Sequence, residues 1–314
     1  MLKDCKAGEQ FKGTVLITDW KESPFRNKRG SFVTLTCQDC SGSLPAKIWE
    51  PKTGYFDWLK EKDIFQIEAS VIEYRGAVEL SILTIQPVGE EKIDLNKLLP
   101  SSPFTREILE QRLQKLRDTL QDGNLKNLLD RILGHPEWGV SFRLVPAAVK
   151  IHHPYLRGLW EHSLNVTDLA RSMAIGYPEV NSNLLVVGAL LHDIGKIFEY
   201  NYERGISFTT DGRLLGHIIM GVDLISREIA GIADFPADLR TKLLHIITSH
   251  HGRYEWQSPR RPKYPEAIII HYADALEVDL WQYQRAKQDN PQEEWSPYVR
   301  SMERCLYLDQ GKQY

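Results

Sequence analysis

The sequence predicts a multidomain α+β protein with an N-terminal five-stranded β-barrel and an all-α C-terminal domain. Residues 10–88 contain five segments that are rich in β-branched and aromatic residues and partly alternate, with Gly, Pro and Asn turn signals between them. From Thr105 onward, apolar residues recur at helical spacing, and no strand-like alternation of comparable length follows. We therefore expect a barrel over residues 1–90, a linker with connecting helices over 91–140, and a helical domain over 141–314.

The order of the predicted strands selects the type of barrel. The five strands are FKGTVLITDW, GSFVTLTCQD, GSLPAKIWE, DIFQIEASVIEY and AVELSILTIQPV, and the helix-compatible segment TGYFDWLKEK follows the third. Five strands with a helix after the third are the order of an OB-fold, with an SH3-like barrel as the alternative. Cys37 and Cys40 form a CxxC motif without a second such motif, which favours a turn between strands over a zinc or redox site.

The helical region begins after a linker. Residues 89–104 contain Gly, Pro and Ser, and the stretch TREILEQRLQKLRDTL opens with Thr105 as a candidate N-cap. The remaining helices are expected to break at Pro and Gly loops near residues 176–178, 231–236 and 258–265.

Composition limits the class of protein. Apolar residues make up 42% and charged residues 26%, which is typical of a soluble globular chain. The sequence has no long uncharged apolar run and no signal-peptide pattern, so we expect a cytoplasmic location and no membrane partner. A net charge of −3 excludes a global basic field, and nucleic-acid binding would have to depend on local patches.

A set of metal-ligand candidates lies in the second half of the chain, at helix ends or within apolar helices. His192 and Asp193 end the run LLVVGALLHDIGK, and about 100° separates neighbouring side chains on a helix, so both can reach one metal or Asp193 can bridge two. Asp274 lies in EAIIIHYADALEVD, where burying an unpaired carboxylate would be costly. Imidazole and carboxylate ligands without thiolate suit Mn²⁺, Fe²⁺, Co²⁺ or Zn²⁺. The candidates are His162, His192, Asp193, His217, His250, His251 and Asp274.

The pattern H…HD…H…HH…D with HDIGK resembles the HD-domain superfamily of metal-dependent phosphohydrolases, whose members are all-α. His217 with both His250 and His251 resembles its binuclear subgroup. An OB-like first domain, combined with the run IHHPYLRGLWEHSL, is similar to the YhaM-type 3′–5′ exoribonuclease family, and this resemblance covers about residues 10–290. Arg157 stands where that family tends to have a glycine.

The resemblance implies a ligand assignment. His162, His192, Asp193 and Asp274 would hold a first ion, and Asp193 would bridge to a second ion held by His217, His250 and His251, with Mn²⁺ as the first choice. Paired ions can activate water and clamp a phosphoryl oxygen, so attack at a 3′ end would release nucleoside 5′-monophosphates. Lys196 is the candidate for stabilising charge on the phosphate.

Basic residues near aromatic rings indicate a path for a single strand of RNA or DNA. His153 and Arg157 precede His162 and could contact a phosphate. Arg253 begins a segment in which Arg260, Arg261 and Lys263 are interleaved with aromatic residues. In the first domain, the segment KESPFRNKRG should form the loop between the first two strands, and we expect weak, salt-sensitive binding there through Lys21, Arg26, Lys28 and Arg29.

The leading functional hypothesis is a metal-dependent 3′–5′ exonuclease that acts on single-stranded RNA, with DNA as a further substrate to test. A phosphohydrolase of nucleotides or cyclic dinucleotides is the second hypothesis, although it needs no OB domain. A non-catalytic OB-type nucleic-acid-binding protein is the third, and the complete ligand set argues against it. The sequence leaves the metal identity and the oligomeric state open.

Overall fold

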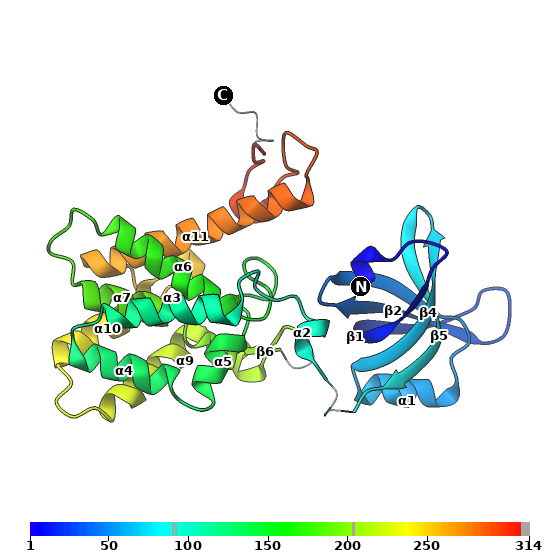
Figure 1. The fold of residues 1–314 in the computed structure, drawn as a ribbon, viewed down its shortest axis with the longest axis horizontal. Coiled ribbons are helices and arrows are strands. Elements are labelled where there is room, and N and C mark those ends of the chain that lie inside the picture. Colours follow the sequence, from blue (N-terminus) through cyan, green and yellow to red (C-terminus); the bar gives the residue numbers. More distant parts are fainter. Residues whose placement is uncertain (90, 92, 203–204, 309–314) are drawn as a thin grey trace. The chain divides into compact units, whose positions relative to one another are not determined.

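A computed structural model of the chain describes residues 1–89, 91, 93–202 and 205–308 (Figure 1). These residues form two compact units. The first contains residues up to Ser101 together with Tyr202, Gly205 and Ile206, and the second contains the described residues from Ser102 to Asn201 and from Ser207 onward. The expected boundary at residue 90 and the last six residues of the expected helical domain, 309–314, lie outside the described residues.

The first unit is a closed five-stranded barrel, which confirms the predicted OB-type fold. Its strands run in the order β1-β2-β3-β5-β4, with β3 and β5 parallel at Ala46 and Leu80 and the other pairs antiparallel. The helix after the third strand is present. The bounds are β1 Gln10–Pro24, β2 Ser31–Asp39, β3 Gly42–Ile48, α1 Thr53–Glu61, β4 Ile64–Tyr74 and β5 Ala77–Pro87, with a 3₁₀ turn at Leu2–Asp4 and the short helix α2 at Leu95–Leu98.

Alternate residues of the strands fill the barrel core, as the period of a half-buried strand requires. In β4, Ile67, Ala69 and Val71 point inward, and Leu59 of α1 packs against the same core. Cys37 of β2 is also part of this core, and burial raises the pKa of its thiol to about 12. A thiol held neutral in an apolar core is a packing residue.

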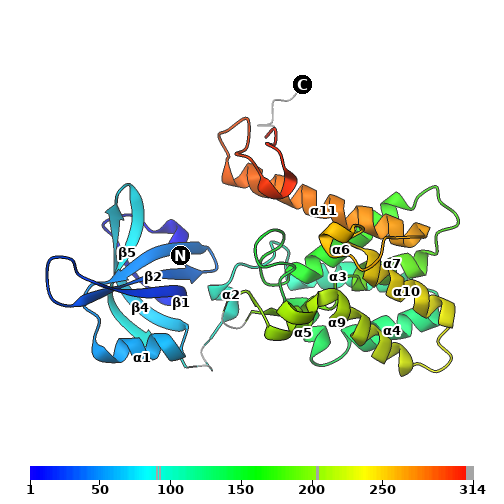
Figure 2. The ribbon, with the colours of Figure 1, turned by 180° about the vertical axis from the view of Figure 1, so that it is seen from behind.

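The second unit is a bundle of helices, as predicted (Figures 1 and 2). Thr105 caps α3 by accepting a hydrogen bond from the Ile108 amide, as the sequence indicated. Among its described residues, the only strands are β6 Tyr200–Asn201 and β7 Ser207–Phe208, which pair in a short hairpin. The helices are α3 Arg106–Asp118, α4 Gly123–Leu133, α5 Trp138–Leu144, α6 Gly158–Met173, α7 Ser182–Leu191, α8 Lys196–Glu199, α9 Thr210–Ala230, α10 Ala237–Ser249 and α11 Pro265–Asp289.

Helix α7 is the centre of this bundle. Every residue from Leu184 to Leu191 is buried, because α7 is apolar on all sides and packs against α4, α6, α10 and α11. Asn181 caps its first turn by accepting a hydrogen bond from the Leu184 amide. Among the described residues, no helix combines the length and the apolar character that a membrane span requires.

Candidate metal centre and active site

The His-Asp pair lies where the central helix ends. After Leu191 the chain leaves α7 and turns through His192 and Asp193 into α8. The turn packs tightly, because a Cβ on Gly195 would lie 1.9 Å from the carbonyl oxygen of His217. Only glycine allows α8 and α9 to approach this closely at this position.

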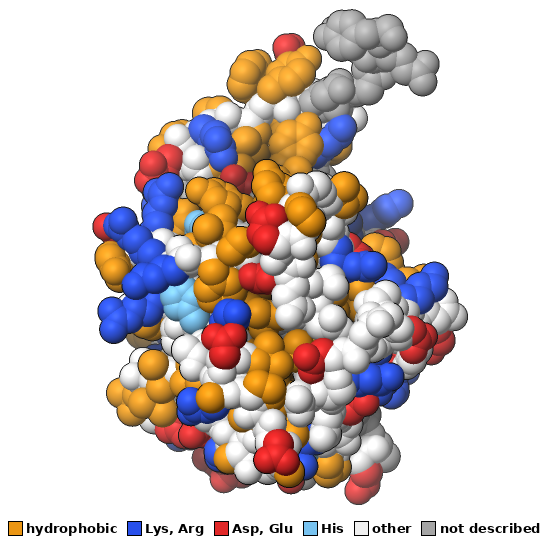
Figure 3. Space-filling view, turned by 90° about the vertical axis from the view of Figure 1, so that its left-hand side faces the viewer, with side chains coloured by type: hydrophobic (Ala, Val, Ile, Leu, Met, Phe, Trp, Pro, Cys, Tyr) orange, Lys and Arg blue, Asp and Glu red, His pale blue; other side chains and the backbone are white. Residues whose placement is uncertain are grey.

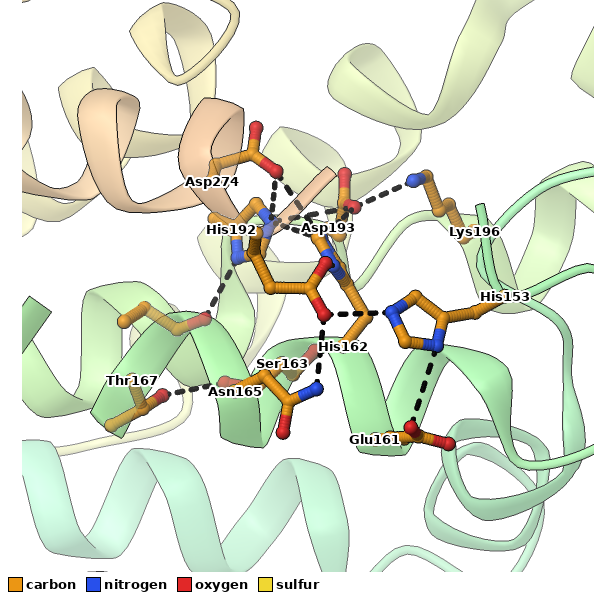
Figure 4. A network of polar contacts seen from close by, with 12 residues as sticks. His153, Glu161, His162, Ser163, Asn165, Thr167, His192, Asp193, Lys196 and Asp274 are labelled. Atoms are coloured by element: carbon orange, nitrogen blue, oxygen red, sulfur yellow. Dashed lines mark hydrogen bonds and ion pairs between the residues drawn. The ribbon is translucent and has the colours of Figure 1, made fainter. Parts of the chain in front are cut away.

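The other five ligand candidates converge on this point from four more elements. Figure 4 shows two of them, His162 and Asp274, beside His192 and Asp193. His162 projects from the first half of α6, and Asp274 projects from α11. Gly216, with a φ of 74°, kinks α9 so that His217 begins its second helical segment. His250 and His251 directly follow α10.

One set of side chains surrounds one oxygen of Asp193. Asp193 Oδ2 lies 3.4 Å from His162 Nε2 and 3.3 Å from His192 Nε2. Asp274 Oδ1 lies 3.3 Å from the same nitrogen of His162 and 3.9 Å from His192 Nε2. These four residues could therefore share one cation.

A second set surrounds the other oxygen. Asp193 Oδ1 lies 3.4 Å from His217 Nε2 and 3.3 Å from His250 Nε2. His217, His250 and His251 each bring a ligand atom within 4.8 Å of the other two. The two oxygens of the Asp193 carboxylate thus divide the other six predicted ligands into two groups of three, which is the arrangement that a bridging carboxylate would need.

The centre fits a divalent ion because several of the buried polar atoms that face one another across it make no hydrogen bond. Within the described part of the chain, Asp193 Oδ1, His217 Nε2 and His250 Nε2 are buried without a hydrogen bond. Leaving a buried donor or acceptor unsatisfied is costly, and such atoms require an explanation. Imidazole nitrogens and carboxylate oxygens are ligands for borderline divalent metals.

The surroundings of Asp193 and His251 keep the first residue deprotonated and the second neutral, the forms that bind metal. Burial would raise the pKa of the Asp193 carboxyl, but Lys196 and His192 outweigh it and keep that pKa well below its usual range. Burial and the neighbouring His250 lower the pKa of His251 to about 4. Metal ligands must be deprotonated carboxylates and neutral imidazoles, and these two residues meet that condition at neutral pH.

His162 shows that the site favours positive charge. Its imidazole is fully buried, and burial alone would lower its pKa. The carboxylates of Glu277, Asp193 and Asp274 outweigh burial and raise the pKa of His162 well above its usual range. Of these three carboxylates, Asp193 and Asp274 face Nε2, so they attract a cation to that side of the ring, where either a proton or a metal ion can bind.

A pocket of about 620 Å³ opens onto the centre. Its wall includes Asp193, Lys196 and Asp274 from the centre, and Arg253 and Trp256 from the segment after α10. Arg253 lies over the Trp256 ring, with 4.7 Å from its guanidinium carbon to the ring centroid. On the face of the helical unit in Figure 3, Lys and Arg side chains gather beside histidines that reach the surface. The volume is in the range of small-ligand sites.

His153 and Arg157, which were expected to contact the substrate phosphate, do not line the pocket. His153 is 1% exposed, and its ring nitrogens lie 2.6 Å from Tyr155 Oη and 2.7 Å from Glu277 Oε1. His153 therefore lies behind the centre, and its neighbour His152 lines the pocket instead. Arg157 has a left-handed φ of 69° at the N-cap of α6 and does not line this pocket. That backbone conformation favours glycine, which matches the glycine expected at this position in the resembling family.

Lys196, the predicted phosphate contact, lies inside the centre. It is 5% exposed, and its Nζ lies 2.6 Å from Asp193 Oδ2 (Figure 4). Its ammonium group therefore reaches the pocket only next to the Asp193 carboxylate.

In the barrel, the predicted basic residues are all exposed, but they do not all lie in the loop. Arg26, Lys28 and Arg29 occupy the turn between β1 and β2. Lys21 lies on β1 itself and pairs with Thr34, because β1 continues to Pro24 after a bulge near Ile17. The expectation that Lys21 is a loop residue is corrected.

Three aromatic residues form a cluster on the barrel beside this turn. The Phe25 and Trp49 rings are stacked, with centroids 6.4 Å apart and planes 9° apart, and Phe32 lies 5.4 Å from Phe25. We call Phe25, Phe32 and Trp49 the aromatic cluster. Lys28 Nζ lies 4.2 Å from the Phe25 ring centroid, so a cation covers one ring. Trp20, in contrast, donates a hydrogen bond from its indole to the Leu59 carbonyl oxygen.

Sequence reasoning missed the residues that support the ligands. Glu277 lies three residues after Asp274 on α11, and Glu199 lies three residues after Lys196 on α8. Both are buried and accept hydrogen bonds from candidate ligands. An acidic residue one helical turn after a candidate site residue was the available signal, although glutamates are common on helix surfaces.

Comparison with known proteins agrees with this architecture. Residues 159–279 match the HD domain family. The chain is 30% identical over 299 residues to the 3′-5′ exoribonuclease YhaM of Bacillus velezensis, covering 95% of this chain and 94% of that protein. It is likewise 30% identical to the protein of that name from Bacillus subtilis, with the same coverage, and 29% identical to that of a Geobacillus species, covering 91% of that protein. HD domains bind divalent metal, and the ligand candidates described above lie in the matched region. With this identity over nearly the whole length of both chains, the protein belongs to the YhaM family of 3′–5′ exoribonucleases.

Proposed function

We propose that this protein is a metal-dependent 3′–5′ exoribonuclease that removes nucleoside 5′-monophosphates from single-stranded RNA. The observation that carries the proposal is the division of the ligands by Asp193, whose two oxygens face His162 and His192 on one side and His217 and His250 on the other. The family names of the relatives support the choice of RNA and the polarity.

The chemistry would combine bound ions with residues of the pocket. Divalent ions in the two ligand sets would supply Lewis acidity and an activated water for phosphodiester hydrolysis. Water adds to phosphorus, the bond to the 3′-oxygen of the penultimate nucleotide breaks, and that oxygen leaves with a proton. Lys196 would stabilise negative charge on the phosphate, because its ammonium group lies in the pocket wall beside Asp193. Arg253 and Trp256 offer a cation and a ring to the terminal nucleotide.

Mn²⁺ is the ion we propose first, because the ligand set is imidazole and carboxylate without thiolate. The experiment uses a 5′-labelled single-stranded RNA of about 20 nucleotides, long enough for one OB site or more. Metal-stripped full-length protein is incubated with and without Mn²⁺, beside Asp193→Ala. Asp223→Ala on α9 is the matched control, since Asp223 is an exposed aspartate whose partner is Arg227.

The proposal expects a Mn²⁺-dependent ladder that shortens from the 3′ end in the wild type and in Asp223→Ala, and intact RNA in Asp193→Ala. Immediate release of a labelled mononucleotide would contradict the polarity. Intact RNA together with hydrolysis of mononucleotides or cyclic dinucleotides would favour the phosphohydrolase alternative. The same substrates in DNA form test the DNA activity that the sequence analysis left open.

The barrel supplies a second proposed contact with RNA. Trp49 of the aromatic cluster is 43% exposed, and Tyr74, at the end of β4, is 50% exposed. Lys47 Nζ lies 4.5 Å from the Tyr74 ring centroid and 5.4 Å from that of Trp49, so one ammonium group lies near both rings. Exposed rings with adjacent cations bind single strands by stacking and phosphate contact, with little dependence on sequence.

Trp49→Ala tests this contact. Loss of one stacked base weakens binding by roughly 1–3 kcal/mol, so the Kd for single-stranded RNA should rise by about 5- to 150-fold. Leu83→Ala is the control, because Leu83 of β5 is another exposed apolar residue of the same barrel, at 59%. Equal affinity of Trp49→Ala and wild type would exclude the stacking role. Binding should also weaken with salt, in proportion to the phosphates contacted.

A cytoplasmic location is part of the proposal as an expectation from the sequence. Oligomerisation is left to direct measurement of mass in solution.

A further inference from the structure

The candidate imidazole ligands share one orientation that the metal assignment alone does not explain. His162, His192, His217 and His250 present Nε2 to Asp193, and all five rings, His251 included, direct Nδ1 to an oxygen outside the ligand sets. In three of them Nδ1 faces a backbone carbonyl oxygen: His192 faces Ala189 at 2.7 Å, His250 faces Ile247 at 2.9 Å, and His251 faces Trp256 at 2.8 Å. A carbonyl oxygen only accepts, so Nδ1 carries the proton in these three rings and Nε2 keeps its lone pair.

The remaining two rings use carboxylates in place of carbonyls, one in each ligand set. His162 Nδ1 lies 2.8 Å from Glu277 Oε2, and His217 Nδ1 lies 3.1 Å from Glu199 Oε1. His162 belongs to the set around Asp193 Oδ2, and His217 belongs to the set around Asp193 Oδ1. Each candidate ion position therefore has one imidazole with a carboxylate behind it.

Both glutamates are fixed by further contacts. Glu277 Oε1 lies 2.7 Å from His153 Nε2 and accepts a hydrogen bond of 2.9 Å from Asn165 Nδ2, so His153 acts on the centre through Glu277. Glu199 Oε1 also accepts a hydrogen bond of 3.0 Å from the backbone amide of His217, the first residue after the kink in α9. That amide has no partner within its own helical segment. Glu199 therefore both caps the segment and orients the His217 side chain at its start.

We propose that Glu277 and Glu199 are positioning residues, one for each ion, and that each fixes the tautomer and the direction of the imidazole in front of it. A carboxylate behind a ligating imidazole also increases the basicity of its Nε2 and thus its affinity for a cation. The proposal extends the two-ion centre of the proposed function and depends on it.

The test measures Mn²⁺ binding to the metal-stripped full-length protein by titration calorimetry, without substrate. Glutamine has nearly the shape of glutamate but lacks its charge, so Glu277→Gln and Glu199→Gln are the variants. Glu266→Gln is the matched control. Glu266 is a buried glutamate of the same α11, and its Oε1 accepts a hydrogen bond of 2.5 Å from the Asn181 amide, away from the imidazoles.

The wild type should bind two Mn²⁺, and Glu266→Gln should bind each of them with the wild-type affinity. Each of the other variants should weaken one of the two binding events by about 10- to 100-fold and leave the other within a few fold. The double variant should weaken both. A purely structural role would not separate the two events, and thermal unfolding of the metal-free variants checks that they fold. If one variant fails to fold, the other still tests the proposal, because Glu277 and Glu199 lie on different helices and behind different rings.

Two results would overturn the inference. Wild-type affinities for both ions in both single variants would exclude the positioning role. Equal weakening of both ions in either variant would exclude the assignment of one glutamate to each ion. A wild-type protein that binds fewer than two Mn²⁺ would instead contradict the two-ion centre, so failure of the proposed function is distinguishable from failure of this inference.

Discussion

Replacing Gly195 by alanine should damage the centre without touching a ligand side chain. An added Cβ would lie 1.9 Å from the His217 carbonyl oxygen and 2.6 Å from the Gly221 amide nitrogen, whereas ordinary contact begins at 3.4 Å. Relief of the first contact requires α8 and α9 to separate by about 1.5 Å, the difference between 3.4 and 1.9 Å. Both contacts are with backbone atoms, so no side-chain rotation can absorb the shift.

This displacement acts directly on one half of the centre. Asp193 lies just before Gly195, and His217 carries the obstructing carbonyl, so the distance between Asp193 Oδ1 and His217 Nε2 must grow from 3.4 Å. A misplacement of about 1 Å can cost 10²-fold in rate, and an overpacked core costs typically about 1–3 kcal/mol. We expect kcat on RNA to fall by at least about 10²-fold and one of the two Mn²⁺ binding events, at the ligand set that contains His217, to be lost.

Gly221→Ala is the matched control at the same interface. A Cβ on Gly221 would meet its nearest atoms at 3.4 Å, the Gly195 amide nitrogen among them. Since Gly221 lies inside α9, alanine should be tolerated and should stabilise the helix by up to about 1 kcal/mol. The assays are RNA hydrolysis, Mn²⁺ calorimetry and thermal unfolding of both variants. Wild-type activity and metal affinity in Gly195→Ala, or equal losses in the two variants, would refute the steric reasoning.

Three further predictions concern the ligands and pH. Asp193→Asn should lower kcat by about 10⁴-fold or more, as removal of an essential group does, and should weaken both Mn²⁺ binding events in calorimetry, whereas loss of only one event would contradict the bridging role. Chelation should lower the thermal midpoint of the wild type but not of Asp193→Asn, since an ion at about 100 times its Kd stabilises by about 2.7 kcal/mol. Burial, with Lys263 and Arg260 nearby, lowers the pKa of His245, so its contribution to stability is complete above about pH 6.5 and is lost as pH falls through the lowered value. His245→Gln should therefore reduce the fall in the urea midpoint between about pH 7 and pH 5, and an unchanged fall would exclude this effect.

The sequence could identify residues whose type is unusual for their local position, such as polar residues at the end of an apolar helix. A histidine and an aspartate that end an apolar helix, as at His192 and Asp193, are visible without a fold, because burying them there would be costly without a partner. The five strands of the barrel and the helix after the third could be predicted for a similar reason, since alternation and turn signals are local properties. The ligand roles themselves stay predictions until metal binding is measured.

The residues that the sequence could not identify depend on geometry between distant elements. His152 and His153 are neighbours in an irregular segment where no helical or strand period sets the side-chain direction, and a left-handed φ of 45° at His153 separates them. Glu277 was hidden because its partner His162 lies 115 residues earlier in the chain. Trp49 follows the end of β3, and only the register of the barrel places it against Phe25.

The position of the centre explains why α7 carries no polar residue on any face between Leu184 and Leu191. A helix buried on all sides is held by packing against α4, α6, α10 and α11, and three of these elements also carry ligand candidates or precede them directly. Interiors packed at this density resist small shifts, so the end of α7 is fixed relative to His162, His250 and Asp274 before any ion binds. The ligand sets need sub-ångström placement, and the apolar helix supplies it at the one end where the chain becomes polar. Stability and the proposed catalysis therefore depend on the same packing, and substitutions that loosen α7 should affect metal affinity before they unfold the domain.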